Sequence, residues 1–361
     1  MYVEILTEPA FEQSSWGKAI KESLVLALGR KKMEFSVLEG LNQIIKKDAS
    51  HFLFLIGSDE KWLGYTVSLC EKNRIHPILL GGVPKGRLSG IFSTVTSDLP
   101  RSMYYLLNHL KGKYKTKPAL YGINPASLSD SARKESFLLY AEDFATERDV
   151  YYNNGSLKNC FQDFLKNADN YDSVICANDY AAISLINGLK ENCFANLPII
   201  VSYGDTRLSK RMGEDLLTVS MRYEEYGEAA VSICKTLDKN PSLLYMNVAV
   251  KWKISKNNPS VKNESAELSY FEDTTLLNSA DEVFYSDTEM REMLLVENML
   301  LGCDNLDLNL LDVIVKGGSY EMAAESCFVS QNTAKYRLKK LMNLCKTKSK
   351  KEFLQLIKKY S

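Results

Sequence analysis

Short apolar runs alternate with amphipathic stretches along the first 255 residues, and this alternation restricts the fold more than any other feature. Eight runs look like buried strands, namely Tyr2–Leu6, Phe52–Ile56, Pro77–Leu80, Gly90–Thr94, Ala119–Tyr121, Ser173–Ala177, Pro198–Ser202 and Leu217–Val219. Helical patterns lie between them, namely Trp16–Leu28, Leu41–Lys47, Leu63–Asn73, Ser102–Leu110, Ala132–Phe144, Asn159–Asn167, Tyr180–Leu189 and Tyr226–Leu237. Regular β-α alternation predicts parallel sheets with helices on both faces.

The length of the chain predicts more than one domain. One parallel sheet rarely needs 255 residues, so we expect two α/β lobes in residues 1–255. The polar segment Lys256–Asn263 contains a proline and closes this part. We interpret residues 256–303 as an acidic linker, in which Asp287–Leu301 is a candidate helix for docking or dimerisation, and residues 304–361 as a third, helical domain.

Composition places the chain among globular proteins, because 45% of the residues are hydrophobic and 25% are charged. The start, Met1 to Glu8, lacks the basic and apolar regions of a signal peptide, and no apolar run approaches the roughly 20 residues of a membrane span. We therefore expect a cytoplasmic protein with no membrane partner. The eight cysteines are scattered with no C-x-x-C pair, which predicts reduced core residues rather than disulfides or metal ligands.

Charge is strongly uneven along the chain, although the total is zero. Residues 316–361 hold eleven Lys and Arg against three Glu, which gives +8, whereas residues 261–315 hold thirteen acids against two bases, which gives −11. A basic terminal module after an acidic connector is typical of a protein that meets a polyanion.

A helix-turn-helix pattern lies inside the basic segment. Leu306–Val315 reads as a helix that stops at Gly317-Gly318, Ser319 caps a second helix through Ser326, and Ser330 caps a third over Gln331–Asn343. A last helix runs from Ser349 to about Lys359. The third helix would enter a DNA major groove.

The start of that third helix carries the side chains that such recognition needs. Gln and Asn can pair with adenine, and Lys can reach guanine or phosphate. The residues predicted to contact DNA are Ser330, Gln331, Asn332, Thr333, Lys335, Tyr336, Lys339 and Lys348. Duplex DNA is therefore the expected macromolecular partner.

The segment Gly318–Lys359 resembles the LuxR-type DNA-binding domain. The resemblance rests on residues that match the motif S..EIA..L.IS..TVK.H...I..KL.V.NR.EL of that family, namely Ser319, Met322-Ala323, Val329-Ser330, Thr333-Ala334-Lys335, Leu341, Leu344 and Ser349–Leu354. Arg337 replaces the usual His and Cys327 the usual Leu, so a neighbouring winged or PucR-like helix-turn-helix group stays open as an alternative.

The order of motifs in residues 2–255 resembles the ligand-binding domain of the lactose-repressor family, which has the type I periplasmic-binding-protein fold. The decisive stretches are Ile175–Ala182, the strand and loop Pro198–Asp205, and Leu217–Gly227. Phe11, Trp16-Gly17, Val95–Asp98 and Arg133–Phe137 match further family motifs upstream. The resemblance implies a two-lobed α/β sensor, with two parallel sheets covered by helices, followed here by a small all-α helix-turn-helix domain.

Carried over position by position, the resemblance implies a cleft that holds a small polar ligand such as a sugar. The side chains at the matching positions are Phe11, Asp98, Arg133, Asn178 and Asp205. Carboxylate, amide and guanidinium groups can bind vicinal hydroxyls. Gly204 stands where the family has the first Asp of a pair, which leaves the hydroxyl contact and the sugar class open.

Two hypotheses of different class follow. The first is a non-enzymatic, ligand-responsive transcription regulator that binds DNA as a homodimer, because one small helix-turn-helix module buries little DNA surface. The chain shows no phosphate loop, nucleophile elbow or metal-ligand spacing, so we assign no catalytic residues, no cofactor and no metal. The second is a binding protein with a degenerate cleft whose terminal domain docks a protein partner.

Overall fold

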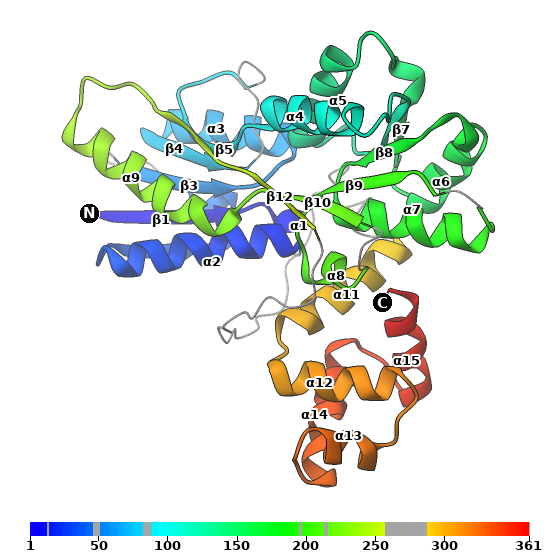
Figure 1. Ribbon diagram of the computed structural model, residues 1–361. Coiled ribbons are helices and arrows are strands. Elements are labelled where there is room, and N and C mark those ends of the chain that lie inside the picture. The colour runs from blue at the N-terminus through cyan, green and yellow to red at the C-terminus, as the bar shows by residue number, and fades with distance from the viewer. Residues whose placement is uncertain are drawn as a thin grey trace.

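The computed structural model describes residues 1–12, 14–45, 51–81, 88–194, 197–212, 216–256 and 287–360. It consists of two α/β lobes and a helical domain that lies beneath them (Figure 1). Of the segment interpreted as an acidic linker, residues 256–303, the part 257–286 lies outside the described residues. Among the described residues, no helix is both long enough and apolar enough to cross a membrane.

A six-stranded parallel sheet forms the centre of the N-terminal lobe. Its strands, in spatial order, are β11 (Asn247–Val250), β5 (Ser93–Ser97), β4 (Ile75–Leu80), β3 (His51–Ile56), β1 (Tyr2–Thr7) and β2 (Glu34–Leu38). The helices of this lobe are α1 (Pro9–Glu12), α2 (Ser15–Arg30), α3 (Glu60–Lys72) and α9 (Tyr226–Lys239). Alternate strand residues pack on α2 and α9 on one face and on α3 on the other.

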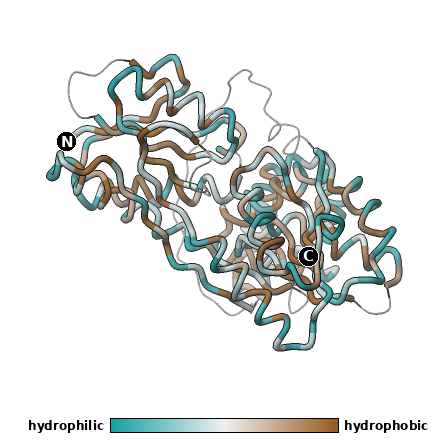
Figure 2. The backbone as a smooth tube through the Cα atoms, turned by 90° about the horizontal axis from the view of Figure 1, so that it is seen from above, coloured by the Kyte–Doolittle hydropathy of each residue, from teal (hydrophilic) through white to brown (hydrophobic). Residues whose placement is uncertain are grey.

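The C-terminal lobe repeats this arrangement. Its sheet runs β12 (Lys253–Lys256), β10 (Leu216–Ser220), β9 (Ile199–Gly204), β8 (Ser173–Cys176), β6 (Pro118–Ile123) and β7 (Val150–Tyr152), and only β12 is antiparallel. The helices are α4 (Leu99–Lys111), α5 (Leu128–Tyr140), α6 (Leu157–Leu165), α7 (Asp179–Glu191) and α8 (Arg207–Lys210). Figure 2 shows the hydrophobic segments running through the interior of both lobes.

The chain crosses between the lobes three times. The crossings join β5 to α4, β10 to α9, and β11 to β12. The predicted fold class, two parallel sheets with helices on both faces followed by an all-α domain, is confirmed.

Some local predictions were wrong. The strand expected at Gly90–Thr94 is β5 at Ser93–Ser97, and Leu41–Lys47 contains only a 3-10 turn at Leu41–Gln43 in its described part. The strands β2, β7, β11 and β12 were not predicted. They are short strands at the sheet edges, where one neighbour is missing and the apolar pattern is weak.

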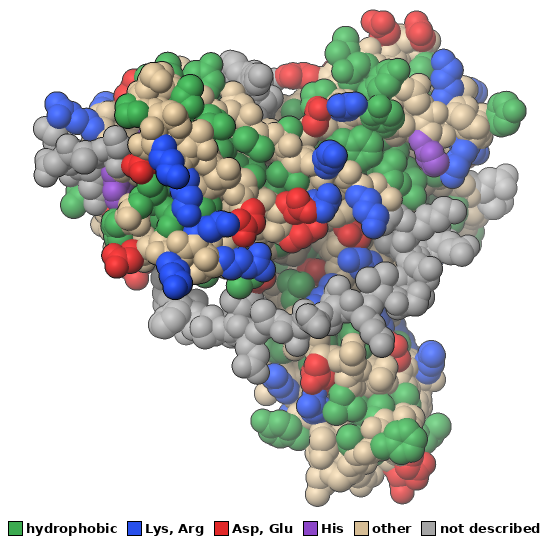
Figure 3. Space-filling model, turned by 60° about the vertical axis from the view of Figure 1, so that its left-hand side comes forward, with side chains coloured by type: hydrophobic (Ala, Val, Ile, Leu, Met, Phe, Trp, Pro, Cys, Tyr) green, Lys and Arg blue, Asp and Glu red, His purple; other side chains and the backbone are tan. Residues whose placement is uncertain are grey.

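The helix α11 (Thr288–Leu301) leads into the helical domain, which consists of α12 (Asn305–Val315), α13 (Tyr320–Ser326), α14 (Gln331–Leu344) and α15 (Lys350–Lys359). Each helix begins at a side-chain cap, supplied by Asp287, Asp304, Ser319, Ser330 and Ser349. In Figure 3 this domain projects from the α/β body.

Candidate ligand and DNA sites

A cavity of about 60 Å³ lies where the carboxyl ends of the two sheets face each other. The N-terminal lobe contributes loops that follow β1, β3 and β4, and the C-terminal lobe contributes loops that follow β6, β8 and β10. The sheets of doubly wound proteins bind ligands at this edge. Lining residues with aromatic, amide or charged side chains include Phe11, Trp16, Asn124, Asp130, Arg133, Asn178 and Tyr203.

Backbone pairing between the lobes closes one side of the cavity. Asp59 and Ser127 form an antiparallel bridge, in which Leu128 N donates to Ser58 O at 3.0 Å and Glu60 N donates to Ala126 O at 3.4 Å. The Leu128 side chain packs in the core of the N-terminal lobe. The structure therefore shows a closed cleft.

A buried ion pair from α5 lies in the wall of the cavity. Arg133 Nη1 donates to Asp130 Oδ1 at 2.5 Å, and the guanidinium lies 4.7 Å from the centre of the Tyr203 ring. Burial raises the pKa of Asp130, and the charge of Arg133 opposes that rise. Among the described residues, buried Arg133 Nε has no hydrogen-bond partner. Arg133 therefore keeps one N–H donor unpaired within the wall of the cavity.

Aromatic rings form another part of the wall. Trp16 on α2 lies between Phe11, at a centroid distance of 6.3 Å, and Tyr180 on α7, at 5.5 Å. The hydroxyls of Ser15 and Tyr180 are 2.9 Å apart, so this contact also joins the two lobes. A wall that has both aromatic and polar side chains suits a ligand with an apolar face and a polar edge.

Three of the five predicted ligand residues meet at the cavity, namely Phe11, Arg133 and Asn178. Asn178 also caps α7, because its side-chain oxygen accepts the Ala181 N–H at 3.0 Å. Asp98 and Asp205 are not among the lining residues. Asp98 caps α4 by accepting the Arg101 N–H at 3.2 Å, and Asp205 pairs with Lys210 at 3.4 Å.

Gly204 occupies a position that no larger residue can take without a shift. Its φ is +153°, and an added Cβ would lie 2.7 Å from Asp179 Oδ2. Buried Asp179 instead binds the loop, since its carboxylate accepts the Thr206 N–H at 2.7 Å and the Thr218 hydroxyl at 3.0 Å. Asp179 therefore excludes a carboxylate at the Gly204 position.

Sequence reasoning missed Asp130, Asn124 and Trp16 as lining residues. Asp130 stands three residues before Arg133, a spacing that brings side chains together on a helix. Asn124 follows a strand at its carboxyl end, as Asn178 does. These two signals were available in the sequence.

The helices α13 and α14 are joined by a short turn, at the place where the sequence predicts a helix-turn-helix. Ala323 and Ala324 of α13 pack against Ala334, Leu338 and Leu341 of α14 within the core. Small residues on α13 permit this close approach. The turn lies at residues 327–329, as predicted.

Most of the predicted DNA residues lie at the cap or along the first turns of α14 and face solvent, whereas Lys348 lies beyond the end of this helix. Ser330 Oγ accepts the Thr333 N–H at 3.1 Å, and Thr333 is half-buried. The others are exposed, namely Ser330, Gln331, Asn332, Lys335, Tyr336, Lys339 and Lys348. This end of the helix is accessible to a groove of DNA.

Arg337 has an internal role that the sequence did not reveal. Its Nη1 donates to Asp304 Oδ2 at 2.7 Å and to Asp307 Oδ1 at 3.0 Å, both at the start of α12. Arg337 therefore holds α14 against α12.

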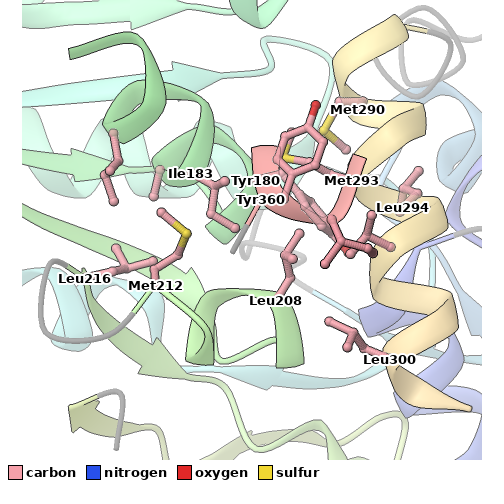
Figure 4. Close-up of a cluster of buried hydrophobic side chains, with 14 of the residues drawn as sticks. Tyr180, Ile183, Leu208, Met212, Leu216, Met290, Met293, Leu294, Leu300 and Tyr360 are labelled. Carbon is pink, nitrogen blue, oxygen red and sulfur yellow. The ribbon is translucent and has the colours of Figure 1, made fainter. Parts of the chain in front are cut away.

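The helix α11 joins the helical domain to the C-terminal lobe through one apolar core. Met290, Met293, Leu294 and Leu300 of α11 point toward Tyr180, Ile183 and Leu208, with Tyr360 between them (Figure 4). Of the two roles considered for Asp287–Leu301, docking is what the structure shows.

Polar side chains also join α11 to α8, and each supplies hydrogen bonds to an end of the other helix. Glu297 of α11 is 1% exposed, and it accepts the Arg207 N–H at 3.1 Å and the Leu208 N–H at 2.7 Å, at the start of α8. In return, Arg207 Nη1 donates to Leu300 O at 2.6 Å, at the end of α11. Burial raises the pKa of Glu297 to about 7.

Comparison with known proteins identifies the fold. No family model and no curated protein matches the chain. Among solved structures, the transcriptional regulator CelR in complex with cellobiose matches with a TM-score of 0.60 and 13% identity, over 70% of this chain and 83% of that one. The transcription regulator CcpA of Lactococcus lactis matches with a TM-score of 0.57 and 15% identity, over 71% of this chain and 99% of that one.

A third match is a LacI-family regulator, CcpA from Weissella paramesenteroides with bound sucrose, at a TM-score of 0.55 and 16% identity, over 71% of this chain and 97% of that one. The two lobes have the fold of LacI-type sensor domains. The covered share of this chain is about the share that the lobes occupy.

Proposed function

We propose that the chain is a ligand-responsive DNA-binding regulator, in which the α/β lobes sense a small polar molecule and α12 to α15 read duplex DNA. One observation carries the proposal: a polar and aromatic cavity between the lobes and an exposed helix-turn-helix belong to one folded unit, joined by α11. Regulation of transcription in the cytoplasm, without catalysis, suits this combination. The likeness of the lobes to transcriptional regulators supports it.

We include a sugar as the proposed ligand class. Similar structures are described as holding cellobiose, sucrose or ribose, and Asn124, Asp130, Arg133 and Asn178 supply the polar groups that hydroxyls bind. The closed cavity of about 60 Å³ is well below the roughly 300–1,000 Å³ of ligand pockets. A sugar therefore enters only when the lobes open.

DNA binding is tested by fluorescence anisotropy with duplexes selected from a random pool. We expect an affinity that falls steeply between about 50 and 200 mM salt, because phosphate contacts release counterions. Lys335→Ala with Lys339→Ala should weaken binding, whereas Lys61→Ala with Lys72→Ala on α3 should not. Absence of salt-dependent duplex binding by the wild-type protein would rule out the regulator.

Ligand binding is tested by thermal-shift screening of sugars, amino acids and nucleosides. A true ligand should raise the melting temperature of the wild-type protein, and both Arg133→Ala and Asn178→Ala should weaken its binding. Asp163→Ala, on the surface of α6, is the control. If both cavity variants bind the hit as well as wild type does, the cavity assignment is wrong.

A homodimer is part of the proposal, because two modules on spaced half-sites supply the DNA contact area that one module lacks. Sedimentation velocity at micromolar concentration tests it. We expect a dimer on the selected duplex, and a protein that stays monomeric both free and bound contradicts this part.

One observation favours a second candidate, a binding protein with a degenerate cleft. The cavity is small, and the Asp130–Arg133 pair occupies its wall. In that case no screened ligand would stabilise the protein, and a protein partner would bind the helical domain in place of DNA.

A further inference from the structure

Two consecutive residues of α11 hold different lobes. Glu297 binds the backbone of α8 in the C-terminal lobe. The next residue, Asn298, accepts a hydrogen bond from Lys18 Nζ at 2.7 Å, and Lys18 belongs to α2 in the N-terminal lobe. This single helix therefore touches both sides of the cleft.

The grip on the C-terminal lobe is extensive and leads back to the cavity. Thr206 caps α8 by accepting the Ser209 N–H at 3.1 Å, and its own N–H donates to Asp179. Asp179 directly follows the cavity residue Asn178. Together with the apolar core around Tyr180 and Met293, these bonds make α11 a fixed part of this lobe.

The hydrogen-bond contact between α11 and the N-terminal lobe is small. Lys18 lies on the first turns of α2, beside Trp16, which lines the cavity, and Ser15, which contacts Tyr180. The bond from Lys18 to Asn298 is half-buried and joins one amine to one amide oxygen. A rotation of the N-terminal lobe about the three crossings would move α2 away from α11 and break this bond.

The helix also leads directly into the DNA-reading helices. Arg207 Nη1 reaches Cys303 O at 3.4 Å, just beyond the end of α11. The next residue, Asp304, pairs with Arg337 on α14. Polar contacts therefore connect the cavity edge, α8, α11 and the recognition helix in sequence.

We propose that α11 couples closure of the lobes to the DNA-reading helices, with the Lys18–Asn298 bond as the contact that reports the closed state. This inference rests on the proposed function. When the lobes close, Lys18 holds α11 from the N-terminal side; when they open, only the C-terminal lobe holds it. The position of α14 then differs between the two states.

The test locks the lobes without needing a ligand. Asp59 and Ser127 face each other as a non-hydrogen-bonded pair in the bridge, a geometry with Cα atoms about 4.5 Å apart that a disulfide can span. The protein carries Asp59→Cys and Ser127→Cys, and Cys193→Ser removes an exposed native thiol. The introduced cysteine pair is oxidised or reduced, and mass spectrometry verifies the disulfide. Duplex affinity is then measured by anisotropy for both forms.

We expect the oxidised and reduced forms to differ in duplex affinity by about fivefold or more, a usual size for coupling between sites. Lys18→Ala should bring the ratio of the two duplex affinities, oxidised to reduced, close to one, and Asn298→Ala should do the same. The double variant should give the same ratio as each single variant. Lys21→Ala, on the same helix but paired with Glu12, should keep the full ratio.

A ratio that persists in both Lys18→Ala and Asn298→Ala overturns the inference, as does a ratio of one in the starting protein. Oxidation of the Cys193→Ser protein without the introduced pair should change nothing. If no form binds duplex DNA, the proposed function itself fails, and that result is distinct from duplex binding that ignores the lock.

Discussion

At the scale of single residues, burial decides how strongly the loss of one partner of an ion pair affects stability. Asp130–Arg133 and Asp163–Lys166 both join a carboxylate to a cation three residues later on a helix. Both side chains of the first pair are 8% exposed, whereas those of the second are 61% and 70% exposed. Water screens the second pair and not the first.

Arg133→Ala should therefore destabilise the protein by about 3–5 kcal/mol, because it leaves a buried carboxylate without its cation. Lys166→Ala, the matched surface control, should cost less than about 1 kcal/mol. Urea denaturation measures both. Asp130→Ala combined with Arg133→Ala should cost less than the sum of the single changes, and strict additivity would contradict the pairing.

Glu297 should make stability depend on pH. Its folded pKa of about 7 lies above the ordinary 4.5, so the folded state binds the proton more tightly than the unfolded state does. The resulting stability, about 3 kcal/mol, is fully present below pH 4.5 and is lost as the pH rises toward 7. Glu297→Gln cannot titrate and should flatten this decline.

Melting temperatures measured between pH 5 and 8 test this prediction. The surface variant Glu228→Gln should keep the wild-type slope. Equal slopes for wild type and Glu297→Gln would show that another group controls the pH dependence.

At the scale of elements, capping residues and small residues determine how α13 and α14 pack. Ser319 and Ser330 begin α13 and α14, and Ala323 lets the two helices approach closely. Arg337 then fixes α14 against α12. The polar start of α14 is thereby left exposed.

Base-reading and phosphate-holding residues should respond differently to substitution. Gln331→Ala or Asn332→Ala should alter preference at one base position and cost about 1–3 kcal/mol there. Lys348→Ala should weaken all sequences alike and reduce the salt slope by about one. Anisotropy on a set of single-base variants of the duplex distinguishes them, and equal effects of all three changes on random DNA would remove α14 as the reader.

At the scale of the whole molecule, the helical domain and the C-terminal lobe share one apolar core. Tyr360 is fully buried near the end of the chain, and its hydroxyl donates to Glu292 at 2.8 Å. Asn187 of α7 donates to Lys359 O at 2.8 Å. We therefore expect the helical domain and the C-terminal lobe to unfold together, as one cooperative unit.

Removal of residues 304–361 should consequently destabilise the α/β lobes, because it exposes the apolar face of α11 and the surface beneath Tyr360. We expect a lower melting temperature and increased binding of an apolar dye. Tyr360→Ala should act in the same direction, by about 3–5 kcal/mol, while Tyr336→Ala on the exposed face of α14 should be neutral. A truncated protein with unchanged melting temperature would contradict the shared core.

Local patterns in the sequence determined much of this protein. Apolar periodicity predicted most strands and helices of the lobes, and Ser319, Ser330 and Ser349 predicted the starts of α13, α14 and α15. The order of short motifs placed Phe11, Arg133 and Asn178 at the cleft through the family resemblance that it carries. These features depend on neighbours within a few residues, so they are readable along the chain. Edge strands such as β2 were missed because a half-exposed strand carries a weak pattern.

Only the tertiary structure decided which polar residues became buried and with whom. Asp98 and Asp205 follow strands as Asn178 does, yet they cap a helix and pair with Lys210 instead of lining the cavity. Glu297 looks like an ordinary surface acid in an amphipathic helix, but it is buried against α8, about 90 residues away in the chain. Burial and pairing at such separations depend on how whole elements pack, and no local pattern encodes that packing.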